Sequence, residues 1–415
     1  MEKRAERGVK MNSKLFGATM MAMRRKCGMT QAALAKRLNV SDKAVSKWET
    51  GLGYPEITLL PEIAAVFGVT VDYLLTGKRR GITVAGNILC DIVKNIDCYP
   101  EKGMLANITG ISRGVGGCAP NTAMDLAKID GTMPLSVIGC VGEDESGRYV
   151  ISQLQRCNID TGKIVVTDQA PTSFSDVMSL PNGERTFFHA RGANALFSPD
   201  HINLADLQCC MLHIGYILLL DRFDQADAVY GTIMARFLHD VQGYGIKTSI
   251  DVVSDSSGDY AQKVIPALRY SDYVIINEIE CCSIWNCSPR REDGTLDLET
   301  LRDAMARTMD CGVGEKVIVH SKEAGFCLSR DGRFTMVPSL DIPEAEIRGS
   351  VGAGDAYCAG CLYSLYNHDT DEEMLKFASA AAACNLFAEN AVDGMRSQKE
   401  IREMMNRYPR KKQPK

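Results

Sequence analysis

The sequence contains no long apolar run, no leader-like segment and no P-loop motif. None of its hydrophobic stretches approaches the ~20 residues that a membrane-spanning helix needs. The first ten residues are mostly charged and include no apolar core, so we expect no signal peptide. The string GxxxxGK(S/T) is absent, which excludes a P-loop kinase. These absences predict a cytoplasmic protein without a membrane partner.

Zinc-binding cysteine spacing is also missing, although the chain has 16 cysteines. The adjacent pairs at 209–210 and 281–282 lack the spacing of metal ligands, and a cytoplasmic location keeps thiols reduced. Cys358 and Cys361 form a CxxC without a second pair. Their place in an apolar segment favours small core residues over a redox or metal role.

Charge is distributed unevenly over the 415 residues. Hydrophobic residues make up 45% and charged residues 24%, which is typical of a soluble globular protein, and the length allows more than one domain. Residues 1–80 carry 15 Lys or Arg against 7 Asp or Glu, whereas the remainder carries 32 against 45. We therefore expect that only the N-terminal head meets a polyanion.

The head, residues 12–77, shows short helical segments separated by brief turns. Thr30 is a good N-cap for a helix over residues 31–38, and Ser41 for one over residues 42–49. Further helices are expected from about residue 15 to near Cys27 and Gly28, at 58–67 and at 71–75. Two helices joined by a three- to four-residue turn predict a helix-turn-helix.

The string MTQAALAKRLNVSDKAVSKWE, residues 29–49, resembles the Cro/C1-type (XRE) DNA-binding domains. In that family the outer face of the third helix enters the major groove, and the domains bind double-stranded DNA as dimers. Trp48 is expected in the core. A solvated charged face is the plainer alternative. The resemblance assigns DNA contacts to Gln31, Ser41, Lys43, Ser46 and Lys47, and phosphate contacts to Arg24, Arg25, Lys36 and Arg37.

The body, residues 82–406, follows a short linker at 77–81 and alternates apolar strands with longer mixed segments. This order predicts an α/β fold with a mostly parallel sheet and helices on both faces. Strands are expected at 82–86, 211–215, 247–251, 273–276 and 316–319. Ligands bind such folds at the carboxyl ends of the strands. The basic, proline-bearing tail from residue 407 is expected to be disordered.

The stretch GSVGAGDAYCAG, residues 349–360, is the centre of the predicted active site. Gly352, Ala353 and Gly354 predict a tight turn at a helix start, where unpaired amides and the helix dipole suit a phosphate. Asp355 follows at once, so a base would lie beside an anion site, as phosphoryl transfer requires. A glycine turn with a helix-start aspartate is the alternative for such a short string.

Several motifs in order resemble the ribokinase-like (PfkB) carbohydrate kinases. Besides GSVGAGDAYCAG, which departs from the family's Asp-Thr at 349–350 and has Tyr357 for phenylalanine, the chain has GGCAPNTA at 116–123 and a GAN at 192–194. The resemblance implies a small β lid at 92–111 and 172–189. It makes Asp355 the base, with Gly352, Ala353 and Gly354 as the anion site. It assigns acceptor contacts to Asp91, Gly116, Gly117, Asn121 and Asn194.

The resemblance also implies ATP and Mg²⁺ as cofactors. Residues 277–280, NEIE, match the family's NxxE, which orders magnesium largely through water, so Glu280 is the expected metal residue and Glu278 a distractor. The nucleotide contacts assigned are Asn277, Glu280, Gly325 and Asn385. In the loop at 320–325 only the glycine matches the family pattern.

Together these features predict an ATP-dependent kinase for a sugar or nucleoside hydroxyl, fused to a DNA-binding head and expected to be a homodimer. One alternative is a transcriptional regulator whose kinase-fold body only senses a sugar. Another is a head that serves only dimerisation. The motifs identify neither the acceptor nor the DNA operator.

Overall fold

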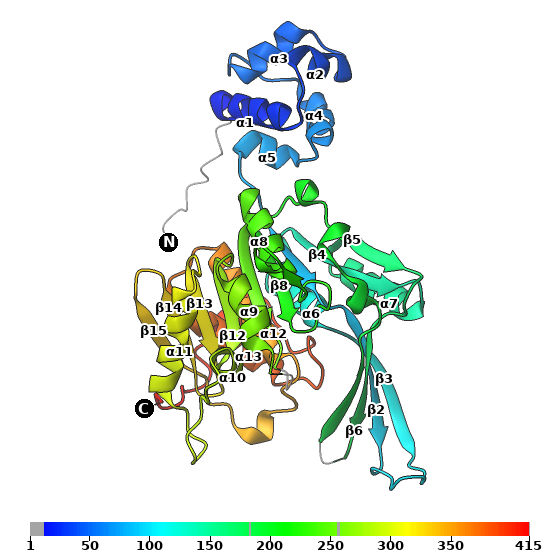
Figure 1. The fold of residues 1–415 in the computed structure, drawn as a ribbon, viewed down its shortest axis with the longest axis vertical. Coiled ribbons are helices and arrows are strands. Elements are labelled where there is room, and N and C mark those ends of the chain that lie inside the picture. Colours follow the sequence, from blue (N-terminus) through cyan, green and yellow to red (C-terminus); the bar gives the residue numbers. More distant parts are fainter. Residues whose placement is uncertain (1–11, 182–183, 255–257, 415) are drawn as a thin grey trace. The chain divides into compact units, whose positions relative to one another are not determined.

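The computed structural model describes residues 12–181, 184–254 and 258–414 (Figure 1). The chain divides into two compact units. The first holds the residues up to Gly81 together with Asn203–Cys210, and the second holds Ile82–Ile202 and Met211–Lys415. No sequence signal indicated that Asn203–Cys210 groups with the first unit. Among the described residues, no helix combines the length and the hydropathy of a membrane span.

The first unit is a bundle of short helices, as expected. Its helices are α1 (Ser13–Lys26), α2 (Gln31–Arg37), α3 (Asp42–Glu49), the 3₁₀ turn η1 (Ile57–Leu59), α4 (Leu60–Phe67) and α5 (Val71–Thr76). Thr30 and Ser41 cap α2 and α3 by accepting from the amides of Ala33 and Ala44. The single helix expected at 58–67 is split because Pro61, which has no amide hydrogen, lies in the first turn of α4. Trp48 is buried in the core, as predicted.

One predicted phosphate contact in the head is wrong. Arg24 is only 9% exposed and forms a two-pronged ion pair with Glu49, Nε–Oε1 at 2.6 Å and Nη2–Oε2 at 2.8 Å. Its Nη1 donates to the carbonyl of Met29 at 2.7 Å, and Gln31 donates to the same Glu49 carboxylate at 2.8 Å. Arg24 therefore fixes the junction of α1, α2 and α3, because a buried guanidinium needs a partner for each donor.

The second unit is built on a nine-stranded sheet. Its order is β15-β14-β13-β12-β11-β8-β1-β4-β5, and all neighbours from β13 to β5 are parallel. The parallel strands are β1 (Ile82–Gly86), β4 (Leu135–Gly142), β5 (Asp160–Thr167), β8 (Met211–Ile217), β11 (Lys247–Val252), β12 (Tyr273–Asn277) and β13 (Lys316–His320). The predicted parallel sheet is thus confirmed.

Helices cover both faces of this sheet because its strand order runs outward from β1 and β8 in two directions. Right-handed crossovers in opposite directions place their helices on opposite faces. The crossover from β1 to β4 carries α6 (Cys118–Ile129), which packs with α12 (Ala353–Tyr366) and through it α13 (Asp371–Asn385). The crossovers beyond β8 carry α8 (Ile233–Gly243), α9 (Tyr260–Leu268), α10 (Glu278–Ser283) and α11 (Leu298–Asp310). Two further α-helices of this unit are α7 (Glu145–Arg156) and α14 (Gln398–Met404).

A separate four-stranded sheet forms the expected lid. It comprises β2 (Leu89–Ile96), β3 (Ile108–Gly116), β6 (Phe174–Ser179) and β7 (Arg185–Ala190) in the order β3-β2-β6-β7. Figure 1 shows β2, β3 and β6 extending away from the large sheet. Because β2 begins three residues after β1 ends, the lid strand leads directly out of β1, an interior strand of the large sheet.

Two further features differ from the expectations. The strands β14 (Ala324–Ser329) and β15 (Phe334–Pro338) add an antiparallel edge that the strand pattern had not indicated. The described part of the tail, residues 407–414, is also tied to the body: Leu340 pairs with Arg410, and the amides of Asp341 and Lys411 donate to the carbonyls of Pro409 and Ser339. The prediction of a disordered tail from residue 407 is wrong because these backbone groups pair with the segment that follows β15.

Candidate active site

The start of α12 provides a backbone site without a side-chain cap. Its N-cap is Gly352, in the left-handed region at φ +75°, and a side chain at that position would overlap Ala391. Only glycine therefore allows the tight turn that opens the helix. Among the described residues no side chain caps this helix start, so the first-turn amides and the positive end of the dipole remain suited to an anion.

Asp355 lies in the first turn of α12 and is held by two donors. Its side chain is buried, at 4% exposure. The hydroxyl of Tyr216 donates to Oδ1 at 2.7 Å, and Nδ2 of Asn121 donates to Oδ2 at 2.8 Å. Burial raises the pKa of Asp355 above its usual value, and the two hydrogen bonds partly oppose that rise. A buried carboxylate of raised pKa is a good proton acceptor.

Asn121 and Tyr216 position this carboxylate. Asn121 was predicted to contact an acceptor, but it lies on α6 and its amide faces Asp355, while its Oδ1 has no partner among the described residues. Tyr216, near the end of β8, was not predicted. The available signal was its place directly after Gly215, at the carboxyl end of a predicted strand.

The predicted acceptor residues gather where β2 and β3 leave the body. Asp91 lies on β2 above Gly116, where a side chain would overlap the Asp91 carboxylate. Gly117 caps α6 at φ +93°, and a side chain there would overlap the carbonyl of Asn87. Asn194 instead pairs with the backbone of Ile88 at 3.0 and 2.9 Å, so it fixes the turn between β1 and β2.

Asp91 opens into a cavity of about 130 Å³. Burial raises the pKa of Asp91 to about 6; the charge of Asp355 adds to the rise and Arg185 opposes it. Arg185 opens β7 and donates to the carbonyl of Glu389 at 3.2 Å. The cavity lining includes Asp91, Arg113, Gly114, Arg185, Val351 and Ala391. It thus combines an acid and a guanidinium close to the start of α12.

Two further cavities meet next to Asp355, at Gly354 and His320. A cavity of about 240 Å³ is lined by Tyr216, Asp251, Asn277, Glu280 and Asp355, among others. A second cavity, of about 380 Å³, is mostly apolar, with Ile342, Ile347, Ala383 and Leu386 in its lining. Gly354 and His320 line both cavities. An apolar cavity that continues past helix-start amides into a polar one suits a nucleotide base and its phosphates, respectively.

The residues of the predicted NxxE motif form a reciprocal cap at the end of β12. The amide of Glu280 donates to Asn277 Oδ1 at 2.8 Å, and the amide of Asn277 donates to Glu280 Oε2 at 2.9 Å. Ser254 donates to Glu280 Oε1 at 2.8 Å, and burial raises the pKa of Glu280 to about 7. Glu278 instead pairs with Arg290. Glu280 and Asp251 offer oxygen ligands at one cavity, which fits Mg²⁺ held partly through water.

The other two predicted nucleotide residues, Gly325 and Asn385, contact segments of the protein next to the site. Gly325 is buried in β14, opposite His320, and a side chain there would overlap the hydroxyl of Tyr357. Asn385 donates to the carbonyl of Val351 at 2.9 Å and so holds the segment that precedes α12. Neither lines the apolar cavity, and a nucleotide contact for either stays a prediction.

Among the predicted DNA contacts, Ser41, Lys43 and Lys47 are exposed and Ser46 is half-buried, all on or next to α3. Arg25, Lys36 and Arg37 are also exposed. Gln31 is partly buried and already donates to Glu49. These assignments stay predictions, and the geometry leaves the α3 residues accessible to a partner.

Comparisons with known proteins identify both parts of the chain. Residues 82–398 match the model of the pfkB family carbohydrate kinases, and residues 20–74 match a helix-turn-helix model. The chain is 24% identical to the ribokinase of Arabidopsis thaliana over 326 residues, covering 78% of this chain and 80% of that protein. It is 23% identical to the 5-dehydro-2-deoxygluconokinase of Bacillus velezensis over 297 residues, covering 71% and 86%, respectively.

Solved structures share the fold of the body. The ribokinase of Thermotoga maritima superposes with a TM-score of 0.65 at 19% identity, covering 79% of this chain and 99% of that one. The ribokinase of Arabidopsis thaliana in complex with ribose and ATP gives a TM-score of 0.65 at 20% identity, with the same coverage.

Proposed function

The chain belongs to the pfkB family of carbohydrate kinases, and from that premise we propose that it transfers the γ-phosphoryl group of ATP to a hydroxyl of a sugar or sugar-like acceptor. The observation that carries this proposal is the position of Asp355. Its buried carboxylate lies in the first turn of α12, at the cavity that contains Asn277 and Glu280, and close enough to Asp91 to raise the pKa of that acid.

Each group then has a defined task. Asp355 accepts the hydroxyl proton as the acceptor oxygen bonds to the γ-phosphorus, and the bond from that phosphorus to the β–γ bridging oxygen breaks, releasing ADP. The amides at the start of α12 stabilise charge on the transferring group. Asp91 orients the acceptor by accepting from its hydroxyls. Mg²⁺, when bound near Glu280 and Asp251, would neutralise phosphate charge.

The direct test is an ADP-release assay on the purified full chain with Mg-ATP. The acceptor panel contains ribose, fructose, a keto-deoxy sugar acid, a phosphorylated ketohexose and several nucleosides. We expect turnover with at least one of them. Silence across the panel, combined with thermal stabilisation by a sugar, would instead support the alternative of a sugar-sensing regulator without kinase activity.

Replacing Tyr216 by phenylalanine is expected to shift the acid limb of the pH–rate profile upward. The Tyr216 hydroxyl favours the charged form of Asp355, so its loss raises the pKa of that carboxylate further. A hydrogen bond to a charged group contributes about 1.5–3 kcal/mol, equivalent to a shift of about one pH unit or more. Single-turnover rates between pH 5 and 8 measure it. Tyr273→Phe is the control, because Tyr273 lies on β12 and its hydroxyl is bonded to Glu315 instead of Asp355. An unshifted acid limb in Tyr216→Phe would contradict the role of Tyr216 in holding the charged form of Asp355.

The 130 Å³ cavity at Asp91, where the acceptor is expected to bind, favours an acceptor with an anionic group. Arg185 lines this cavity and forms no ion pair with any described residue, and its guanidinium matches a carboxylate or phosphate. Several relatives are named 5-dehydro-2-deoxygluconokinase, and a gluconate derivative carries a carboxylate. We expect the sugar acid or the phosphorylated ketohexose to outperform ribose in kcat/KM.

Arg185→Ala is accordingly expected to raise KM for the anionic acceptor about tenfold or more and to leave KM for ribose nearly unchanged. Arg113→Ala is the matched control, because Arg113 lines the same cavity but its guanidinium is bound by Glu145 and Ser146. Equal losses for both acceptors in Arg185→Ala would show that this arginine does not select for charge.

We infer that the head binds double-stranded DNA through α3 and links the kinase to transcription. The accessible Lys43 and Lys47 on a capped helix support this role, as does the match to a helix-turn-helix model. Such domains commonly bind two half-sites as a dimer, which makes a homodimer the expected form. An operator affinity that no acceptor or nucleotide changes would argue against regulation of the head by the body.

A further inference from the structure

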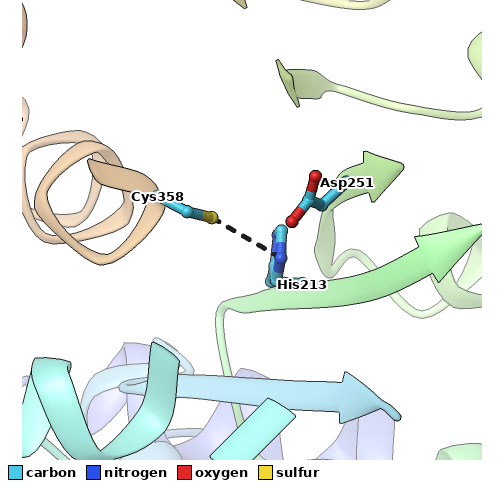
Figure 2. Close-up of side chains that lie close together, drawn as sticks. All are labelled: His213, Asp251 and Cys358. Atoms are coloured by element: carbon cyan, nitrogen blue, oxygen red, sulfur yellow. Dashed lines mark hydrogen bonds between the residues drawn. The ribbon is translucent and has the colours of Figure 1, made fainter. Parts of the chain in front are cut away.

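Three potential metal ligands converge at the polar cavity of about 240 Å³ that contains Asp355. His213 comes from β8, Asp251 from the end of β11 and Cys358 from α12, and Figure 2 shows the three side chains pointing toward one another. One ligand atom from each lies within 4.8 Å of the others. Their side chains are 0%, 8% and 2% exposed. They form a compact nitrogen, oxygen and sulfur donor set inside the second unit.

One distance within this set, between Cys358 and His213, fits tetrahedral coordination. Sγ of Cys358 lies 3.5 Å from Nε2 of His213. Zinc bonds of about 2.3 Å to sulfur and 2.0–2.1 Å to nitrogen, at the tetrahedral angle, place those two atoms about 3.5 Å apart. The same distance also suits a weak S–H···N hydrogen bond, so spacing alone does not distinguish the two.

The surroundings of His213 orient it as a ligand. Its Nδ1 is bonded to Oγ of Ser249 on β11 at 3.0 Å, which directs Nε2 at Cys358. This is the arrangement in which a second partner fixes the ring of a ligating histidine. Nε2, which faces Sγ of Cys358, is therefore the ring nitrogen available to a metal ion.

We propose that His213, Asp251 and Cys358 bind a borderline-soft divalent ion, Zn²⁺, at a site that shares Asp251 with the Mg²⁺ site expected at Glu280 but takes its other ligands from His213 and Cys358. A thiolate and a carboxylate together balance the charge of the ion, and a thiolate with an imidazole selects zinc over magnesium. Binding releases the proton of Cys358 to solvent, since only the thiolate is a ligand. The remaining coordination position is left for water.

The ion has a route in and a consequence for the kinase. Asp251 and Cys358 both line the 240 Å³ cavity that contains Asp355, so an ion can reach the three ligands from this cavity. Cys358 follows Asp355 by three residues and therefore lies on the same face of α12. A doubly charged ion there stabilises the ionised form of Asp355 and weakens it as a base. The bound zinc is therefore inhibitory.

The sequence had favoured core packing for both cysteines of the CxxC, and that interpretation suits Cys361, which is fully buried. Cys361 therefore supplies a matched control. It is a buried cysteine on the same helix, one turn further from the active site, and it is not part of the donor set.

The test uses Co²⁺ as a spectroscopic probe on the purified, metal-free full chain. We expect a sulfur-to-cobalt charge-transfer band together with tetrahedral d–d bands, both displaced by Zn²⁺. Cys361→Ser should retain these bands and Cys358→Ser should lose the charge-transfer band. Ser249→Ala should weaken Zn²⁺ affinity about tenfold or more through loss of ring orientation. No charge-transfer band in the wild type, or an unchanged band in Cys358→Ser, would overturn the site.

Thermal unfolding and circular dichroism verify that each variant is folded. Should Cys358→Ser fail this check, His213→Gln is used, for which loss of the tetrahedral d–d bands is expected and their persistence would refute the site. Because the probe reports binding and not turnover, the outcome is independent of the proposed kinase activity. In active protein, micromolar Zn²⁺ at saturating Mg-ATP should lower kcat for the wild type and Cys361→Ser; equal inhibition of Cys358→Ser would refute the inhibitory role of this site.

Discussion

Replacement of Asp355 by asparagine is expected to lower kcat by about 10²–10⁴-fold, the usual contribution of a positioned general base. The acceptor affinity should change only a few-fold, because Asp91 and the glycines at 116–117 are untouched. The measurement pairs ADP release with acceptor binding by calorimetry. Turnover equal to that of the wild type would sink the assignment of Asp355 as the base.

The variant is well suited to isolate the base because its neighbours can adapt. An asparagine at 355 can still accept from Tyr216 through its oxygen. On the other side its new amide would face the amide of Asn121, but Oδ1 of Asn121 has no partner among the described residues, so that side chain can rotate and accept instead. Asp125→Asn is the matched control for packing. Asp125 is a buried carboxyl on α6, and its two oxygens have no hydrogen-bond partner among the described residues.

Local features of the sequence predicted the parts of this fold that depend on neighbours along the chain. The caps Thr30 and Ser41 fix where α2 and α3 begin, because an N-cap bonds to an amide three residues on. The same holds for the turn at Gly352, whose positive φ excludes a side chain. The apolar runs of the parallel strands were legible because buried strands are hydrophobic on both faces.

Roles that depend on distant partners were not predictable in this way. The sequence suggests that Arg24 is a surface cation, but in the structure it is bound by Glu49, which lies 25 residues away along the chain. Asn194 matches an acceptor motif, yet its amide is consumed by the backbone of Ile88. Tyr216 reaches Asp355 across 139 residues. For Arg24 and Asn194 the sequence identified an important position but not the group that it serves, and Tyr216 was not predicted at all. Only the packed structure shows the partners of these three side chains.

A second large effect is expected from the triple variant Lys43→Ala/Ser46→Ala/Lys47→Ala in the head. Phosphate contacts contribute through counterion release, and each base contact contributes about 1–3 kcal/mol. Loss of all three side chains should weaken DNA binding by about 100-fold or more at physiological salt. The salt dependence should also weaken: the slope of the logarithm of the binding constant against the logarithm of the salt concentration should fall by roughly one for each phosphate contact removed.

The probe is a duplex selected by the wild-type protein from a randomised pool, since the operator is not defined by the sequence. All three positions lie on α3 outside the head's hydrophobic core, which includes Val45 and Trp48, so the fold should survive, as circular dichroism can verify. Lys14→Ala/Lys78→Ala removes the same charge from elsewhere in the head and should bind nearly as the wild type. If the folded triple variant binds equally well, α3 is not the recognition helix. If the wild type selects no duplex at all, the head serves association between copies of the chain, and sedimentation would then detect dimers that a chain lacking residues 1–81 does not form.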